Sequence, residues 1–79
     1  MELKHEENYP GGDGRKIFRI RIFEESTKMT TSISRVLFDK NENEIDVLPM
    51  TEYSDRLNSD LDILVEKAKR TILHIWMNI

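Results

Sequence analysis

The chain has 79 residues, of which 38% are hydrophobic and 34% are charged, and its net charge is −3 at pH 7. This length allows one domain, and the absence of cysteine excludes disulfides and thiolate-bound zinc. The sequence has neither an apolar N-terminal segment nor an apolar run of the roughly 20 residues that span a bilayer, so we expect a cytoplasmic protein.

Residues 1–14 are predicted to form a flexible tail. They hold all three glycines and one of the two prolines, in the run NYPGGDG, which is typical of turns and chain ends. Residues 15–79 are then predicted to form a single domain.

Three strands are expected next, in KIFRIRIFEE (16–25), TTSISRVLFD (30–39) and EIDVLPM (44–50), because these segments alternate or are rich in β-branched and aromatic residues. Pro49 is expected to end the third strand. With KNEN as a four-residue hairpin loop, Phe38 is expected opposite Ile45 and Val36 opposite Val47, and a three-residue turn between the first two strands brings Phe18 opposite Val36. The inner face then consists of Phe18, Ile20, Ile22, Val36, Phe38, Ile45 and Val47. The outer face then carries Ile17, Phe23, Ile33, Leu37 and Leu48 among three arginines. A slip of one residue would exchange the two faces.

From about Ser54 the apolar residues follow a helical period. The predicted core-facing stripe consists of Leu57, Leu61, Leu64, Ala68, Ile72, Ile75 and Ile79. Thr51, Ser54 and Ser59 are candidate N-caps. The sequence therefore predicts an α+β fold, in which a three-stranded antiparallel sheet (β-β-β) is followed by one long C-terminal α-helix packed on it.

The end of this helix is apolar on a second side, because Ile63, Leu73 and Met77 fall roughly opposite the stripe. Three strands and one helix cannot cover both sides, so we expect a homodimer. The predicted dimer interface consists of Ile63, Leu73, Met77, Trp76 and Ile79. The plain alternative is a frayed terminus that tolerates exposed apolar residues.

Negative charge is concentrated in residues 36–66, which hold nine acidic and two basic residues. A surface of this kind complements a basic protein, including one whose groove binds nucleic acid, so it can act as a nucleic-acid mimic. The predicted acidic partner-binding surface consists of Asp39, Glu42, Glu44, Asp46, Glu52, Asp55, Asp60 and Asp62. The plain alternative is an ordinary solvated surface.

Positive charge is concentrated in residues 15–35, with six basic residues against two acidic ones. Arginines that alternate along a strand can follow phosphates, and an aromatic ring beside them can stack on a base. The alternative function is therefore a nucleic-acid-binding dimer with contacts at Arg19, Arg21, Phe23 and Arg35. The plain alternative is that these arginines pair with carboxylates of the chain or of its partner subunit.

No catalytic constellation can be assembled from the sequence. His5 and His74 are the only histidines, and His74 has no acidic residue one helical turn before it. Asp60 and Asp62 are two positions apart on a helix, so their carboxylates diverge. The YPGGDG run lacks the residues of a phosphate-binding loop. We therefore expect a non-enzymatic protein without metal or cofactor, namely a homodimeric inhibitor or modulator that binds a basic protein.

Overall fold

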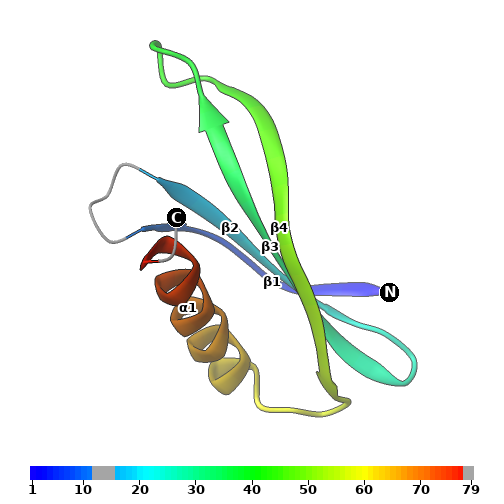
Figure 1. The fold of residues 1–79 in the computed structure, drawn as a ribbon. Coiled ribbons are helices and arrows are strands. Elements are labelled where there is room, and N and C mark those ends of the chain that lie inside the picture. Colours follow the sequence, from blue (N-terminus) through cyan, green and yellow to red (C-terminus); the bar gives the residue numbers. More distant parts are fainter. Residues whose placement is uncertain (12–15, 78–79) are drawn as a thin grey trace.

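The computed structural model of the chain describes residues 1–11 and 16–77, with side chains through Ile75. Four strands precede one helix, in the order β1 (Glu2–Pro10), β2 (Ile17–Glu24), β3 (Lys28–Phe38), β4 (Glu44–Arg56) and α1 (Leu61–Met77). Each strand pairs antiparallel with the next one along the chain, and α1 lies against one face of the sheet (Figure 1). The predicted α+β class, with a C-terminal helix on an antiparallel sheet, is confirmed.

The predicted number of strands is wrong, because the structure has a strand where the sequence indicated part of a tail. Strand β1 pairs with β2 from Glu2 opposite Glu24 to Pro10 opposite Ile17. Its apolar alternation is weak because the helix-side residues His5, Glu7 and Tyr9 are only half-buried at the edge of the sheet. An edge strand that is not fully covered keeps polar side chains on both faces, which conceals it in the sequence.

The core lies between α1 and the central strands β2 and β3. Its buried cluster consists of Phe18, Ile20, Ile22, Met29, Ile33, Leu64, Ala68 and Ile72. The three residues from β2 and the three from α1 are among those predicted to face inward. Full burial of a large apolar side chain contributes about 1.5–3 kcal/mol, so this cluster dominates the stability of the fold.

The predicted register between β2 and β3 is wrong by one residue. The structure pairs Ile17, rather than Phe18, with Val36, and it places Ile33 opposite Ile20 in the core. Val36 therefore shares the outer face with Ile17, and Ile33 moves from the predicted outer face to the core. Because side chains alternate with a period of two, this single step exchanges the faces of β3.

The pairing of Val36 with Val47 is as expected, but a bulge follows it. Phe38 pairs with Glu44, so Ile45 is an extra residue in β4. Phe38 and Ile45 are 41% and 62% exposed, and the prediction that both lie in the core is wrong.

Strand β4 does not end at Pro49. Pro49 lies opposite Ser34 on an edge strand, where a missing N–H is tolerated, and a second bulge at Met50 restores the pairing. The strand continues to Arg56, so the expected helix start at about Ser54 is also wrong.

Helix α1 begins after a tight turn. Asn58 has a φ of 67°, and the Ser59 amide donates to the Arg56 carbonyl at 3.2 Å. Asp60 then caps the helix, since its Oδ1 accepts from the Asp62 amide at 2.9 Å.

Candidate protein-interaction surfaces

The hairpin formed by the end of β3 and the start of β4 projects beyond the helix. We call residues 36–50 the arm; Figure 1 shows it extending past α1 and past the near ends of β1 and β2. Strand β2 begins opposite Val36, so beyond this point the arm has two strands only. A two-stranded ribbon is marginally stable in water unless something packs against it.

The arm exposes large apolar side chains. Phe38, Ile45, Leu48 and Met50 are between 37% and 62% exposed. They make up four of the eight exposed large hydrophobic side chains in the part of the chain that the structure describes. Leu48 lies opposite Arg35 on the helix side of the sheet, whereas Phe38 lies two residues after Val36 on the outer side, so the arm exposes apolar side chains on both faces. Because soluble proteins expose few such groups within one short segment, the arm is a candidate interaction surface.

The turn of the arm is held by the Asp39 carboxylate, whose Oδ1 accepts from the Asn41 amide at 2.8 Å and the Asn43 amide at 3.0 Å. These backbone hydrogen bonds, that of Asn43 first, lower the pKa of Asp39. Glu42 has a left-handed φ of 64° and is exposed. The turn therefore presents Glu42 to solvent from an ordered backbone.

An ion pair joins the start of β4, next to the turn of the arm, to the rest of the sheet. The Arg19 guanidinium contacts Glu44 at 2.5 Å and also donates to Asn8 Oδ1 at 3.0 Å. The hydrogen bond between Arg19 and Glu44 raises the pKa of Arg19 and lowers the pKa of Glu44. Strands β1, β2 and β4 are thus connected on the outer face, the face away from α1.

The four candidate nucleic-acid contacts do not form one basic surface. Arg19 pairs as described, and Arg21 Nε donates to Glu6 at 2.6 Å. Phe23 is half-buried on the outer face, whereas Arg35 lies opposite Phe18 and therefore on the helix side. Arg19 and Arg21 are therefore paired with carboxylates of the chain itself, as in the alternative that does not involve nucleic acid.

The eight acidic candidates separate into groups. Asp39, Glu42, Glu44 and Asp46 belong to the arm, whereas Asp60 and Asp62 lie at the start of α1, at the other end of the molecule (Figure 1). Between them, Glu52 is exposed, and Asp55 contacts the Lys67 ammonium at 2.7 Å. The largest group is therefore on the arm, next to the exposed apolar side chains.

Of the predicted dimer interface, Ile63 and Leu73 are exposed, at 62% and 52%. Glu66 and Arg70 are exposed on the same side of α1, as the helical period requires, so charged residues interrupt this apolar face. The side chains of Trp76, Met77 and Ile79 lie outside those that the structure describes.

Sequence reasoning placed Leu48 on the outer face of the sheet, although it pairs with Arg35 on the helix side, and did not assign Met50 to the surface. The signal was present, because both flank Pro49 in the run VLPM, and proline is confined to edges and bulges of sheets. Apolar residues beside such a proline belong to an edge that neighbouring strands do not cover.

Comparisons with protein-family models, with curated proteins and with solved structures found no match. Within residues 1–11 and 16–77, no three His, Cys, Asp or Glu side chains gather where they could hold a metal ion. No helix in the same ranges is long and apolar enough to cross a membrane. The structure thus defines a small α+β protein with a four-stranded meander, one covering helix and a projecting apolar arm.

Proposed function

We propose that the protein is a non-enzymatic binding module that docks onto a basic partner protein through the arm and thereby inhibits or modulates it. The observation that carries this proposal is the exposure of Phe38 and Ile45 on the two-stranded part of the arm, together with that of Leu48 and Met50 on the adjoining part of β4. Burying these side chains against a partner contributes hydrophobic free energy and also gives the two-stranded ribbon the support that it lacks.

The charge of the arm supports a basic partner. Residues 36–50 contain four acidic side chains and one lysine. Arg19 already neutralises Glu44, whereas Glu42 and Asp46 have no cationic partner among the described residues. Apolar groups with unpaired carboxylates at their margin match a partner surface in which lysines or arginines surround an apolar centre.

Self-association is a separate part of the proposal. The exposure of Ile63 and Leu73 supports an α1-to-α1 contact between two copies. A dimer of this kind would display two arms.

The nucleic-acid alternative has weaker support. Arg19 and Arg21 are paired within the chain, and the net charge of the chain is −3. Binding a phosphate backbone would require these ion pairs to open, which offsets the gain from counterion release.

The proposal is tested by affinity capture followed by mass spectrometry, with three baits compared in parallel. The first bait is the natural chain, and the second carries Phe38→Ser and Ile45→Ser on the arm. The third bait, Leu3→Ser, is a matched control, because Leu3 is 48% exposed, close to the 41% of Phe38, but lies on β1 outside both proposed surfaces. We expect a basic protein that the first and third baits retain and the second loses.

The charge contribution is tested with Glu42→Lys and Asp46→Lys in the same assay. We expect this double substitution to weaken capture and to remove most of its dependence on salt. Proteins that all three baits retain equally, or arm-dependent partners that are acidic, would contradict the proposal.

A further inference from the structure

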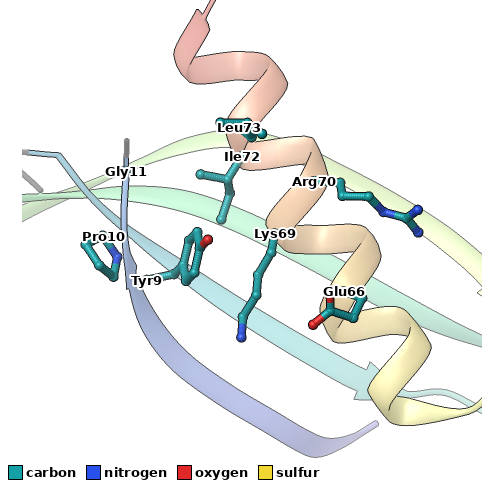
Figure 2. A pocket seen from close by; sticks show the side chains of 8 residues that line it. All are labelled: Tyr9, Pro10, Gly11, Glu66, Lys69, Arg70, Ile72 and Leu73. Atoms are coloured by element: carbon teal, nitrogen blue, oxygen red, sulfur yellow. The ribbon is translucent and has the colours of Figure 1, made fainter. Parts of the chain in front are cut away.

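A second surface lies between strand β1 and helix α1, on the side of the sheet that α1 covers. A groove of about 460 Å³ separates them, and it is lined by Tyr9, Pro10, Gly11, Glu66, Lys69, Arg70, Ile72 and Leu73. Figure 2 shows Tyr9 and Lys69 reaching toward each other from the two sides of this groove. The arm contributes no residue to the groove, so the inference below does not depend on docking through the arm, whereas Leu73 is shared with the α1 face proposed for self-association.

One wall of the groove is the end of β1, at Tyr9 and Pro10, and β1 is an edge of the sheet in the part of the chain that the structure describes. The Gly11 amide donates to the Lys16 carbonyl at 2.6 Å. This bond shows which residues of β1 direct their backbone N–H and C=O groups toward β2. In an antiparallel ladder every second residue bonds to the neighbouring strand, so Tyr9 and Glu7 bond toward β2. The backbone groups of Glu6 and Asn8 therefore point outward, where a fifth strand could pair with them.

Only a short part of this edge is available. A bulge between Leu3 and His5 interrupts the register, and Pro10 has no amide hydrogen. Such features block the open-ended addition of strands along a sheet edge. Between them, residues 5–9 keep a regular register and leave room for one short extended segment.

Three charged side chains line the groove, namely Glu66, Lys69 and Arg70, and of these the Glu66 carboxylate is the one that is both unpaired among the described residues and directed toward β1. Lys69 is already engaged, because its ammonium lies 3.8 Å from Glu7 and 5.3 Å from the centre of the Tyr9 ring. Figure 2 shows the Arg70 guanidinium on the side of α1 away from Tyr9, and the Glu66 carboxylate on the side toward β1. No ion pair of Glu66 occurs among the described residues, so its carboxylate is available to a cationic ligand.

We infer that the groove binds an extended segment of another protein, which adds to β1 as a fifth strand and places a lysine or arginine against Glu66. On the same face of this segment, apolar side chains would contact Tyr9, Ile72 and Leu73. Main-chain pairing supplies affinity in this mode of binding, and the side chains that enter the groove supply specificity.

The test uses a fluorescein-labelled heptapeptide, Thr-Val-Thr-Lys-Thr-Val-Thr, whose valines and lysine share one face of an extended strand. The sequence is the same in both directions, so the orientation of pairing need not be known. Fluorescence anisotropy should show saturable binding to the natural chain. A peptide with alternate backbone amides methylated should not bind, because it cannot complete the ladder.

Glu66→Lys tests the charge, and Asp62→Lys is its matched control, because Asp62 is another exposed acid of α1 that does not line the groove. We expect Glu66→Lys to weaken binding about fivefold and to favour a peptide with glutamate in place of lysine, as an exposed ion pair allows. Asp62→Lys should leave both affinities unchanged.

Amide hydrogen exchange locates the bound segment. The amides of Glu6 and Asn8 should exchange rapidly in the free protein and slowly with the peptide bound. Binding that survives backbone methylation, or that leaves these two amides unprotected, would overturn the inference. Protection of the same amides in the free protein at high concentration would also overturn it, because a second copy of the chain would then occupy the edge.

Discussion

Strands β3 and β4 run through two regions of the molecule that differ in coverage rather than in composition. Beneath α1, Ile33 is fully buried, whereas Ile45 on the arm is 62% exposed. Both regions contain β-branched and aliphatic residues that favour strands. The comparison teaches that the reach of the helix, and not the apolar content of a strand, decides which part of this sheet becomes core.

The largest expected effect is the difference in stability loss when isoleucine is replaced by alanine in each of the two regions. Ile33→Ala should lower the free energy of unfolding by about 3 kcal/mol, because it leaves a cavity beneath α1. Ile45→Ala should change it by less than about 0.5 kcal/mol. Urea titration followed by circular dichroism measures both values, and losses of similar size would show that the arm is packed in solution.

The next effect concerns the exposed side of α1. If two copies associate there, sedimentation of the natural chain gives twice its mass of 9.4 kDa. Leu73→Glu should then weaken the dimer by about 2 kcal/mol, since it places a carboxylate against an apolar surface. The stability of each subunit should stay close to that of the natural chain. An unchanged mass in this variant would exclude the α1 contact.

A smaller effect is expected at Thr31, which is fully buried beneath α1 although it is polar. Its hydroxyl has no hydrogen-bond partner among the described residues. Thr31→Val removes this unsatisfied group at almost constant volume, so it should raise the free energy of unfolding by about 1 kcal/mol. A lower stability in the urea titration would show that the hydroxyl forms a hydrogen bond in solution.

The smallest effect is the response of the arm to acid. The folded-state pKa values of Asp39 and Glu44 are lowered by hydrogen bonds, so both groups stabilise the arm above their ordinary pKa values of about 4. This contribution is lost as the pH falls through the lowered pKa values. NMR should therefore show that the Asn41 and Asn43 amides lose their hydrogen-bonded shifts, while residues beneath α1 keep theirs. Simultaneous loss in both regions would contradict the comparison.

The sequence predicted what depends on strong periodicity. The helical stripe from Leu64 to Ile72 and the inward residues of β2 follow directly from spacing, and the structure places them in the core. The predicted start of the helix was too early, because Thr51 and Ser54 resemble N-caps. In the structure these two residues belong to β4, which continues past two bulges. Bulges depend on pairing with a neighbouring strand, so a single segment does not reveal them.

The surfaces were predicted less well, for two physical reasons. The step of one residue between β2 and β3 assigned Phe38 and Ile45 to the core, so the arm was not recognised as exposed. Strand β1 was not predicted because its side chains are polar at an incompletely covered edge. The groove beside Tyr9, which β1 helps to form, was therefore not predicted either. Charge content, by contrast, indicated the acidic turn without any knowledge of register.

The strand order β1-β2-β3-β4 has a consequence for synthesis on the ribosome. Each strand pairs with the one made just before it, so the sheet can assemble in the order of translation with short loops to close. Its apolar face nevertheless stays bare until α1 has been made, because no strand covers that face. The nascent chain is therefore most prone to aggregation, and most in need of a chaperone, in the interval before this helix leaves the exit tunnel.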